Sequence, residues 1–480
     1  MMHMVSLSCL LLALLAGAGC SADKRPDRLN FLIIVADDLN WNSVGAFGSP
    51  INDITPNIDQ LAAEGMRFNR AHVTVAVCQP SRGALATGRY PYRSGITGFF
   101  HTEKPIPTLV PLLKDIGYFC GILSKVEHSS PTKDTPWDFL VDMQSLGMGR
   151  DKDRYREEME AFIAQSRASS QPFYLMLNSN DPHRPFSGSD QEKEMWPETR
   201  IVPPSNAYSP ADVPVPEFLP DLPEIRQELA EYYSSVKRLD DLVGVVLDVL
   251  DNAGLADHTM VMFLSDNGMA FPFAKTNCYL NSTKTPWIVR WPGYVQPASL
   301  DNEHFISGID FFPTILEAAG VPVPAGTDGT SFVSVLNGKK QSGRTAVFTQ
   351  FYETSAREEF PMRCIQTENY GYIYNFWANG EQVFRNESQT GRTWRAMQRA
   401  AALHPDVLRR TTFFSHRTPE EFYDLERDPD ALHNLIDHPD YQDEVATMRA
   451  ALFRWMEQHG DPAYSAWPQN MKSTLARDSI

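Results

Sequence analysis

Buried strands and helices alternate along the first two thirds of the chain. Continuous apolar runs predict strands in LNFLIIVADD, YFCGILS, PFYLMLNSNDPH, HTMVMFLSDNG and TPWIVRWPG, because a strand covered on both faces needs no polar positions. Helices are predicted between them in TPNIDQLAAEG, RYREEMEAFIAQSRASS, DFFPTILEAAG and a long amphipathic segment over about residues 224–252. This alternation predicts a doubly wound α/β domain with a mostly parallel sheet.

One of these helices carries clear boundary signals. Thr55 is a good N-cap residue, Pro56 suits the first helical position, and Gly65 follows the last helical residue. We therefore predict a helix over residues 56–64, directly after the first strand and its loop.

The pattern changes after about residue 345. AVFTQFYET, MRCIQTEN and YGYIYNFW predict antiparallel strands, and DEVATMRAALFRWMEQHG predicts a closing helix. The Arg-rich residues 385–412 have too little periodicity to assign. We predict a main, site-bearing domain over residues 28–345 and a smaller α+β domain over residues 346–470.

The N-terminus has the pattern of an export signal. Residues 1–20 form a short apolar run that ends in small residues, although no Lys or Arg precedes it. The AGC that ends at Cys20 resembles a bacterial lipoprotein box, in which Cys20 would carry a lipid anchor. Gly17 stands where such boxes usually have Leu, so simple cleavage near Gly19 is the alternative. We expect a periplasmic protein or an outer-membrane lipoprotein of a bacterium.

Net charge and cysteine content exclude some classes of partner and of fold. The 480 residues carry a net charge of −17, which argues against a nucleic-acid partner. An anionic small substrate is still compatible, since a pocket can be cationic while the surface is acidic. Besides the two cysteines of the signal, the chain has four, too few and too scattered for a disulfide framework: Cys78, Cys120, Cys278 and Cys364.

Polar residues follow several predicted strands. Ligands in such folds bind beyond the carboxyl ends of the strands, so residues far apart in sequence should meet there. Carboxylate and amide oxygens suit Ca²⁺ or Mg²⁺ better than zinc. Acids after a strand can also cap the next helix, but two such clusters at two strand ends favour a metal site. The residues at these ends are Asp37, Asp38, His183, Asp266 and Asn267.

The stretch CQPSRGALATGR has the pattern of an anion site at a helix N-terminus. Pro80 suits the first turn of a helix, which would place Cys78 among free backbone N–H groups. Arg82, one turn later, can bind a sulfate or phosphate with two N–H groups. Taken alone, Cys78 could be an activated thiolate nucleophile. A soft thiolate is nevertheless a poor neighbour for an oxygen-rich divalent site.

The same stretch resembles the signature of the sulfatase family, C-x-P-S-R followed by T-G-R. ADD, TPNIDQLAAEG, SKVEH, DPHRPF, SDNG and EEFYDLERDPDALHNL match the family in order. The resemblance implies that a maturation enzyme oxidises Cys78 to formylglycine (3-oxoalanine), whose hydrated aldehyde is the nucleophile. It also implies one Ca²⁺, held by Asp37, Asp38, Asp266, Asn267 and an oxygen of the modified Cys78. The mismatch with a soft ligand then disappears, because the sulfur is gone.

The resemblance implies roles for further side chains. Lys125 and His128, in SKVEH, match a lysine and a histidine that contact the nucleophile and the sulfate. In many sulfatases that histidine is two residues after the lysine and Gly precedes the lysine; here the spacing is three and Ser124 precedes, as in the iduronate-2-sulfatase pattern. The other implied positions are the sulfate contact Arg82, the leaving-group pair His183 and Lys275, and the substrate contact His101, for which a solvated loop histidine is the alternative.

The resemblance implies a sulfated oligosaccharide as the substrate and leaves two types of sulfate linkage open. LSDNGMAFPFAKTNCYL is similar to the sulfamidase branch, which removes N-sulfate from glucosamine. Lys275 stands where that branch has Arg, and the two are not interchangeable at an anion. An O-sulfatase acting on an algal polysaccharide such as ulvan is therefore the alternative.

Two other classes of protein are less compatible with the sequence. A phosphoesterase of the alkaline phosphatase superfamily would have Ser or Thr as nucleophile and a histidine-rich zinc shell. An inactive glycan-binding protein would lack at least one site residue, whereas every expected position is filled.

Overall fold

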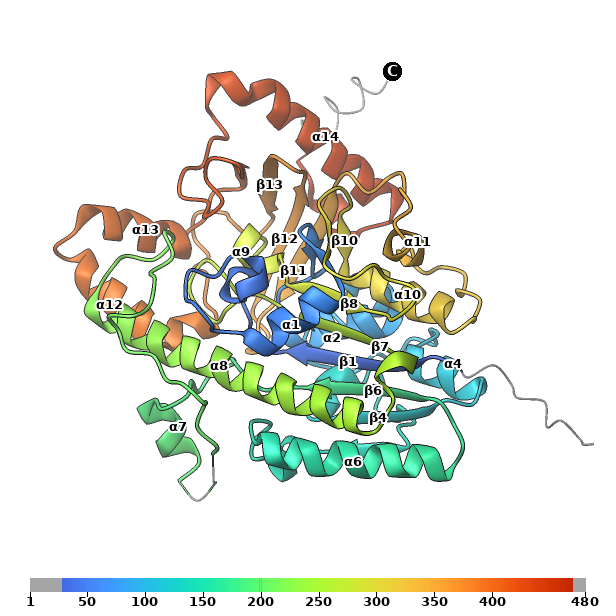
Figure 1. Cartoon of the computed structure of the whole chain (residues 1–480). Coiled ribbons are helices and arrows are strands. Elements are labelled where there is room, and N and C mark those ends of the chain that lie inside the picture. The colour runs from blue at the N-terminus through green and yellow to red at the C-terminus, as the bar shows by residue number, and fades with distance from the viewer. Residues whose placement is uncertain (1–27, 198, 200, 469–480) are drawn as a thin grey trace, which may run out of the picture.

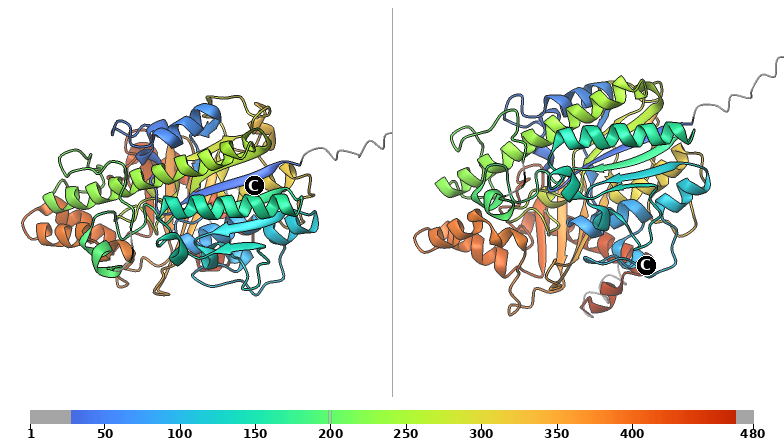
Figure 2. Two further views of the ribbon diagram at one scale, coloured as in Figure 1. Left: turned by 60° about the horizontal axis from the view of Figure 1, so that its bottom comes forward. Right: turned by 90° about the horizontal axis from the view of Figure 1, so that it is seen from below.

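The computed structural model describes residues 28–197, 199 and 201–468, so the predicted signal and Cys20 lie outside the described residues. A central eight-stranded sheet has the strand order β5-β4-β6-β1-β7-β8-β2-β9 (Figures 1 and 2). Its pairs from β5 to β7 are parallel, and β8 is antiparallel to both of its neighbours. This confirms the mostly parallel α/β sheet. The strands are β1 (Asn30–Ala36), β2 (Met66–Phe68), β4 (Phe119–Leu123), β5 (Phe139–Val141), β6 (Phe173–Asn178), β7 (Thr259–Ser265), β8 (Trp287–Arg290) and β9 (Ser299–Asp301).

Helices cover both faces of this sheet, which explains the apolar runs in the sequence. Alternate residues of β1 point to opposite faces, so Leu32 and Ile34 join one hydrophobic core while Phe31 and Ile33 join the other. Every residue of β1 is buried, so a polar side chain in this strand would lose its hydrogen bonds to water. Apart from the first residue, Asn30, the strand is therefore apolar. The first core includes residues of α1 (Pro56–Glu64), α6 (Lys152–Ala168) and α8 (Pro223–Asn252), and the second those of α4 (Leu109–Asp115) and α10 (Phe311–Ala318).

Helix α1 has the predicted bounds and the predicted N-cap residue, Thr55. It begins at Pro56 and is followed by Gly65. The Thr55 side chain makes no capping bond. Its Oγ1 instead accepts a hydrogen bond from the Gly45 amide at 2.8 Å and donates one to Asp59 Oδ1 at 3.1 Å. Thr55 is thus the N-cap residue as predicted, but its hydroxyl ties the preceding loop to the helix and does not bond the first helical amides.

A second sheet of four antiparallel strands follows the first one in sequence. Three of its strands were predicted, β11 (Val347–Glu353), β12 (Glu359–Gln366) and β13 (Tyr370–Asn375), and the fourth, β14 (Glu420–Asp424), was not. One face packs against α14 (Gln442–Gln458), the predicted closing helix. The other face contributes Phe360 and Met362 to the main core, so the two sheets share a continuous interior. The domain boundary at residue 345 stays a prediction.

The Arg-rich region that the sequence left unassigned is helical. It forms the short 3-10 helix η6 (Glu387–Thr390), α12 (Arg392–Ala401) and α13 (Pro405–Ser415). Trp394 and Met397 of α12 join the main core, and α12 packs against the first half of α8 (Figure 1). The arginines of α12 lie on the polar side, where Arg392 and Arg399 pair with glutamates of α8. This packing brings residue 387 towards the carboxyl edge of the central sheet.

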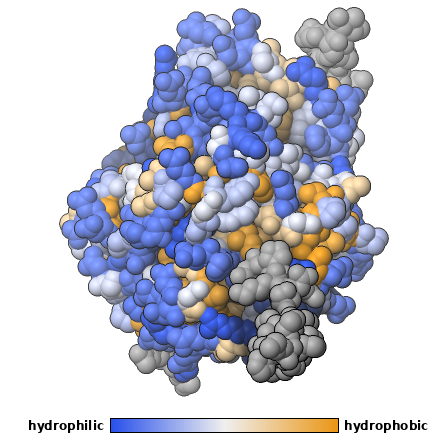
Figure 3. All heavy atoms as spheres, turned by 45° about the vertical axis from the view of Figure 1, so that its right-hand side comes forward, coloured by the Kyte–Doolittle hydropathy of each residue, from blue (hydrophilic) through white to orange (hydrophobic). Residues whose placement is uncertain are grey.

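One face of the molecule shows how polar and apolar residues are distributed on the surface. On the face shown in Figure 3, hydrophilic residues predominate and hydrophobic residues form smaller areas between them. Within the part of the chain that the structure describes, no helix is both long and apolar enough to cross a membrane.

Candidate active site

The carboxyl ends of four neighbouring strands supply the polar residues predicted at a common edge. Asp37 and Asp38 follow β1, and Asp266 and Asn267 follow β7, whose last residue Ser265 lies opposite Ala36 of β1. His183 comes after β6 and Lys125 after β4, on the other side of β1 in the sheet. The parallel sheet therefore turns four distant sequence segments into one cluster.

The acidic residues of this cluster are in direct contact. Asp266 Oδ1 accepts a hydrogen bond from the Asp38 amide at 3.2 Å, and Asn267 Nδ2 donates one to Asp38 Oδ1 at 2.7 Å. Asp38 has a φ of 65°, in the left-handed region that aspartate tolerates better than most residues. Ligand atoms of Asp37, Asp38, Cys78 and His183 all lie within 4.8 Å of one another. These side chains are placed to share one small ligand.

Helix α2 (Cys78–Thr87) presents Cys78 to the cluster from its first residue. The thiol is almost completely buried and donates a hydrogen bond to Asp37 Oδ1 at 3.4 Å. Burial raises the pKa of the Cys78 thiol well above its usual value; nearby Lys275 opposes this shift, and the Asp37 and Asp266 carboxylates add to it. The encoded cysteine is thus held as a neutral thiol, which is a poor nucleophile.

Arg82 lies one helical turn after Cys78 and is completely buried. Its Nε donates a hydrogen bond to Asp266 Oδ2 at 2.9 Å, and its Nη2 lies 2.8 Å from the same oxygen but, among the described residues, has no hydrogen-bond partner. Nη1 donates to Asn178 Oδ1 and, at 3.3 Å, to Ser129 Oγ. The guanidinium is fixed in one orientation, as a binding group for an anion must be.

Two lysines add positive charge on different sides of the carboxylates. Lys125 forms an ion pair with Asp37, and Lys275 Nζ lies 2.9 Å from Asp38 Oδ1. Burial lowers the pKa of Lys125 and of Lys275, but the adjacent carboxylates outweigh burial and raise both above their usual values. Both lysines are therefore charged. Lys125 has a φ of 49°, a backbone conformation that is strained for this residue type.

His183 completes the predicted set at the outer edge of the cluster. Its Nε2 lies 3.8 Å from Asp38 Oδ2, and its Nδ1 donates to the Arg184 carbonyl at 2.5 Å. A carbonyl only accepts, so Nδ1 carries the proton and Nε2 is the atom that faces the cluster. Burial, followed by the charge of Lys275, lowers the pKa of His183 to about 4. An anion bound beside it would raise that pKa again.

The loop that carries His183 is held by buried ion pairs. Asp181 accepts from Arg238 Nε at 2.7 Å and Nη2 at 2.9 Å, and lies 3.3 Å from Arg150 Nε. Arg150 Nη2 also donates to the His183 carbonyl at 2.9 Å. A loop cross-linked in this way keeps the imidazole in place without help from a substrate.

Two predicted histidines lie apart from the ionic contacts. His128, on α5 (Val126–Ser129), packs edge-on against Phe99 with ring centroids 5.4 Å apart. Its Nδ1 is buried and has no hydrogen-bond partner among the described residues. Burial, aided by Lys125, lowers the pKa of His128 to about 3. His101 is half-buried in an irregular segment and, among the described residues, has no hydrogen bond or ion pair to the cluster. Both roles stay predictions.

Glu387 is a member of the cluster that the sequence did not reveal. Its Oε2 lies 3.0 Å from Lys275 Nζ and its Oε1 lies 3.4 Å from His183 Nε2. Burial raises the pKa of Glu387, but the charges of Lys275 and His183 outweigh burial and lower it to about 2. No motif marks this residue, because it reaches the site through the packing of α12 on α8.

The cluster fits a hard divalent cation. Asn267 Oδ1 is buried and, among the described residues, has no hydrogen-bond partner, as expected for an oxygen that faces a cation. Burial raises the pKa of Asp38 and of Asp266 to about 7, which shows that their negative charges are incompletely compensated by the protein alone. Four carboxylates face three cationic side chains, so the ionised cluster carries one negative charge in excess: Asp37, Asp38, Asp266 and Glu387 against Arg82, Lys125 and Lys275.

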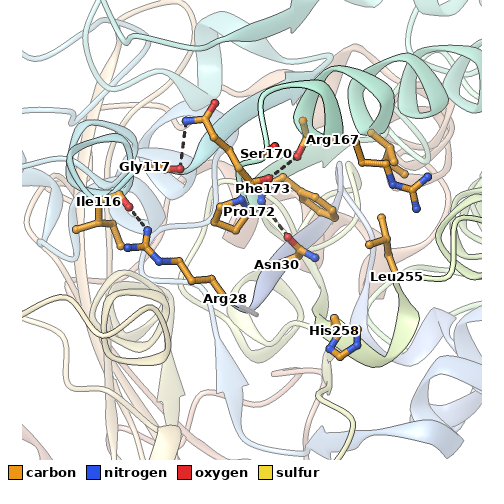
Figure 4. A pocket seen from close by; sticks show the side chains of 13 residues that line it. Arg28, Asn30, Ile116, Gly117, Arg167, Ser170, Pro172, Phe173, Leu255 and His258 are labelled. Atoms are coloured by element: carbon orange, nitrogen blue, oxygen red, sulfur yellow. Dashed lines mark hydrogen bonds between the residues drawn. The ribbon is translucent and has the colours of Figure 1, made fainter. Parts of the chain in front are cut away.

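A separate pocket lies at the opposite edge of the sheet. Its volume is about 730 Å³, and Asn30 and Phe173, the first residues of β1 and β6, line it (Figure 4). Arg28 lies in the wall of this pocket, and its guanidinium donates a hydrogen bond to the Ile116 carbonyl. The guanidinium is therefore engaged with the protein backbone. Among the described residues that line it, this pocket has no group of carboxylates and cations comparable to the cluster, so we place the chemistry at the other edge.

Comparisons of the sequence with known proteins agree with the site. The sulfatase family model matches residues 29–321, and the model of the C-terminal part of N-sulphoglucosamine sulphohydrolase matches residues 269–385. The chain is 30% identical to human N-sulphoglucosamine sulphohydrolase over 95% of this chain and 94% of that protein. It is also 28% identical to an ulvan-active sulfatase of Formosa agariphila, over 91% of this chain and 81% of that one.

Solved structures share the fold. One is a protein in complex with its substrate D-glucosamine-2-N,6-O-disulfate; it has a TM-score of 0.68 and 19% identity and covers 91% of this chain and 99% of that chain. Another is the phosphonate monoester hydrolase of Agrobacterium radiobacter, with a TM-score of 0.67 and 17% identity over 90% and 96% of the two chains. Since the same fold serves different esters, the fold alone does not select the substrate.

Proposed function

Because this chain belongs to the sulfatase family, and is therefore a sulfuric ester hydrolase or a sulfamidase, we propose that it removes sulfate from a glucosamine-containing oligosaccharide, with N-sulfate as the favoured linkage. The observation that carries the proposal is the match of residues 269–385 to the C-terminal part of N-sulphoglucosamine sulphohydrolase. That segment includes both Lys275 and the strands β11 to β13 beside the site. It therefore covers the side of the cluster at which a leaving group would lie.

An O-sulfatase acting on ulvan is the second candidate. Two ulvan-active sulfatases of Formosa agariphila are 26% and 28% identical to the chain over more than nine tenths of its length. Lys275, which replaces the arginine of the sulfamidase branch, also weakens the case for an N-sulfate. Both candidates are exported glycan-degrading enzymes in our proposal, located in the periplasm or anchored through Cys20 in the outer membrane.

Two groups absent from the encoded chain complete the proposed site. We assign Cys78 to conversion into formylglycine by a maturation enzyme, and its hydrated aldehyde would supply the nucleophilic oxygen. We assign Asp37, Asp38, Asp266 and Asn267 to one Ca²⁺, which would supply positive charge against the sulfate. This cation would change the net charge of the ionised cluster from −1 to +1, which favours a singly charged sulfate ester.

The side chains already in place account for the remaining chemistry. Arg82 and Lys125 would bind the sulfate oxygens and stabilise the charge that grows on them in the transition state. Lys275 Nζ and His183 Nε2 both lie near Asp38 and would contact the leaving group. A bound sulfate would raise the pKa of His183, and its Nε2, once protonated, would donate that proton to the departing nitrogen or oxygen. His128 would be an additional sulfate contact and His101 a contact to the sugar.

A panel of defined substrates tests the proposed linkage. The matured enzyme would be incubated with N-sulfated glucosamine, O-sulfated heparin disaccharides and ulvan oligosaccharides, and the released sulfate measured by ion chromatography. We expect N-sulfated glucosamine to be hydrolysed with the largest kcat/KM. Release of sulfate from the ulvan oligosaccharides alone would overturn the N-sulfate assignment and leave the sulfatase activity intact.

Replacement of His183 should affect sugar and aryl substrates differently. His183→Ala removes the proposed proton donor, so we expect kcat on a sugar sulfate to fall by about 10²- to 10⁴-fold. A nitrophenyl sulfate releases a stable phenolate that needs no proton, so its kcat should fall much less. Steady-state kinetics on both substrates measures the difference. An equal loss on both would show that His183 has another role.

A further inference from the structure

A carboxylate and an imidazole, those of Glu387 and His183, form the outer layer of the active site. The Glu387 side chain is 27% exposed and that of His183 is 26% exposed. The cationic groups behind them are more deeply placed, with 10% exposure for Lys125 and 2% for Lys275. A sugar that enters from solvent would therefore lie against Glu387 and His183 when its sulfate reaches the buried cations.

The position of Glu387 is fixed from both sides. The preceding residue, Asn386, donates a hydrogen bond to Thr276 Oγ1, directly after Lys275 in sequence. Four residues later, Gly391 lies against the buried ion pair of Arg184 and Glu228, whose charged atoms are 3.0 Å apart. A Cβ at Gly391 would lie 2.3 Å from Arg184 Nη2, so the chain approaches this pair more closely than any side chain would allow.

The carboxylate of Glu387 has unused hydrogen-bonding capacity. Oε2 is engaged by Lys275 at 3.0 Å, whereas the 3.4 Å from Oε1 to His183 Nε2 is longer than a usual N–H···O bond. An ionised carboxylate offers about four lone-pair sites and no donor. It can therefore accept a further hydrogen bond from a sugar hydroxyl or amine, and it repels a second anion.

We propose that Glu387 is a specificity-determining residue, which accepts a hydrogen bond from a donor next to the scissile sulfate and disfavours sugars that carry a second anionic group there. The inference deepens the proposed function and rests on it for the choice of sugar. Unlike the buried carboxylates, Glu387 is separated from the proposed cation site by Lys275 and acts on the sugar and not on the metal. Selection against a competitor by a repulsive charge is a common route to specificity.

The test compares one sugar with and without a second sulfate. The kcat/KM for glucosamine N-sulfate and for glucosamine N,6-O-disulfate would be measured for the wild type and for Glu387→Gln, which removes the charge and keeps the shape. We expect the wild type to prefer the monosulfated sugar and the Gln variant to lose about tenfold of that preference, as for two charges about 5 Å apart in a partly solvated site. Glu387→Asp retains the charge and should retain most of the preference.

A matched control separates this effect from a general disturbance of η6 and α12. Glu231→Gln removes a carboxylate that pairs with Arg392 at 2.9 Å in the same region but does not contact the cluster, so its substrate preference should equal that of the wild type. Thermal melting would verify the folding of each variant, with Glu387→Ala as a second uncharged variant. An unchanged preference in a folded uncharged variant, or no preference in the wild type, would overturn the proposal.

Failure of the proposed function would look different. A wild type that hydrolyses neither glucosamine but releases sulfate from ulvan oligosaccharides would refute the proposed sugar alone. The same comparison of Glu387→Gln with the wild type would then be made on ulvan oligosaccharides with one and two sulfates.

Discussion

Cys78→Ala is expected to abolish sulfate release, with a loss of at least about 10⁴-fold in kcat, because it removes the precursor of the proposed nucleophile. The thiol is buried but small, so its removal should lower the free energy of unfolding by only about 1 kcal/mol. Mass spectrometry of the active wild type should show residue 78 lighter than cysteine by the change from thiol to aldehyde. Sulfate release and peptide mass are measured on the same preparations.

Cys120→Ala is the matched control for this experiment. Cys120 lies on β4, is as buried as Cys78 and has a thiol whose pKa is also raised by burial, yet it lies outside the cluster. Its replacement should leave kcat unchanged. A fully active enzyme whose Cys78 is unmodified would show that the thiol itself is the nucleophile.

Asp266→Asn should remove Ca²⁺ binding and activity together. The carboxylate is a proposed ligand of the cation and also the partner of the buried Arg82 guanidinium. We expect kcat/KM to fall by at least about 10³-fold, as expected when a major electrostatic contact to the transition state is lost. Calcium content, measured by elemental analysis, should fall from one ion per chain to none. The amide is chosen over alanine because an unpartnered buried Arg82 would cost about 3–5 kcal/mol in stability.

The stability of the metal-free wild type should depend on pH in a defined direction. Burial raises the pKa of Asp38 and of Asp266 from 3.8 to about 7, so their contribution to stability is present below about pH 4 and is lost as the pH rises through about 7. The proposed Ca²⁺ would bind the ionised carboxylates, so the increase in Tm on addition of Ca²⁺ should be larger at pH 8 than at pH 6.

A matched variant and a competing metal would test this assignment. Asp240→Asn alters another buried carboxylate, which accepts from the Asn57 and Ile58 amides of α1 far from the cluster, and should leave calcium binding intact. One equivalent of zinc in the purified enzyme, without calcium or magnesium, would contradict the ligand assignment.

The parts of the fold and site that could be predicted share one property: they depend on local sequence. The apolar run of β1 is followed directly by two acids in the chain. The strand, and the position of Asp37 at the carboxyl edge of the sheet, could therefore be predicted together. The same holds for the start of α2 at Cys78 and for His183 after β6. Parallel pairing then brings these short signals to the same edge of the sheet.

The parts that escaped prediction depend on contacts between distant segments. Glu387 lies more than a hundred residues after Lys275, and its place is set by Asn386 on Thr276 and by Gly391 against Arg184. The strand β14 is short and carries three acids, which do not indicate a strand, yet it pairs with β13 over five positions and Tyr372 Oη donates a hydrogen bond to Glu420. Thr55 occupies the N-cap position predicted for it, but the hydrogen bond of its hydroxyl to the Gly45 amide joins a loop ten residues away and could not be predicted.

The burial of Cys78 sets an order of events for newly made protein. The residue is 2% exposed, begins a helix whose every residue is buried, and lies beneath the outer layer of Glu387 and His183. An enzyme that oxidises this thiol would need an extended segment around it, and the folded chain offers none. The proposed modification would therefore precede the docking of α2 against the rest of the fold. In a variant that folds more slowly, the Cys78 thiol would be accessible for longer. Such a variant should contain a larger fraction of modified residue 78, even if its yield of native protein is lower.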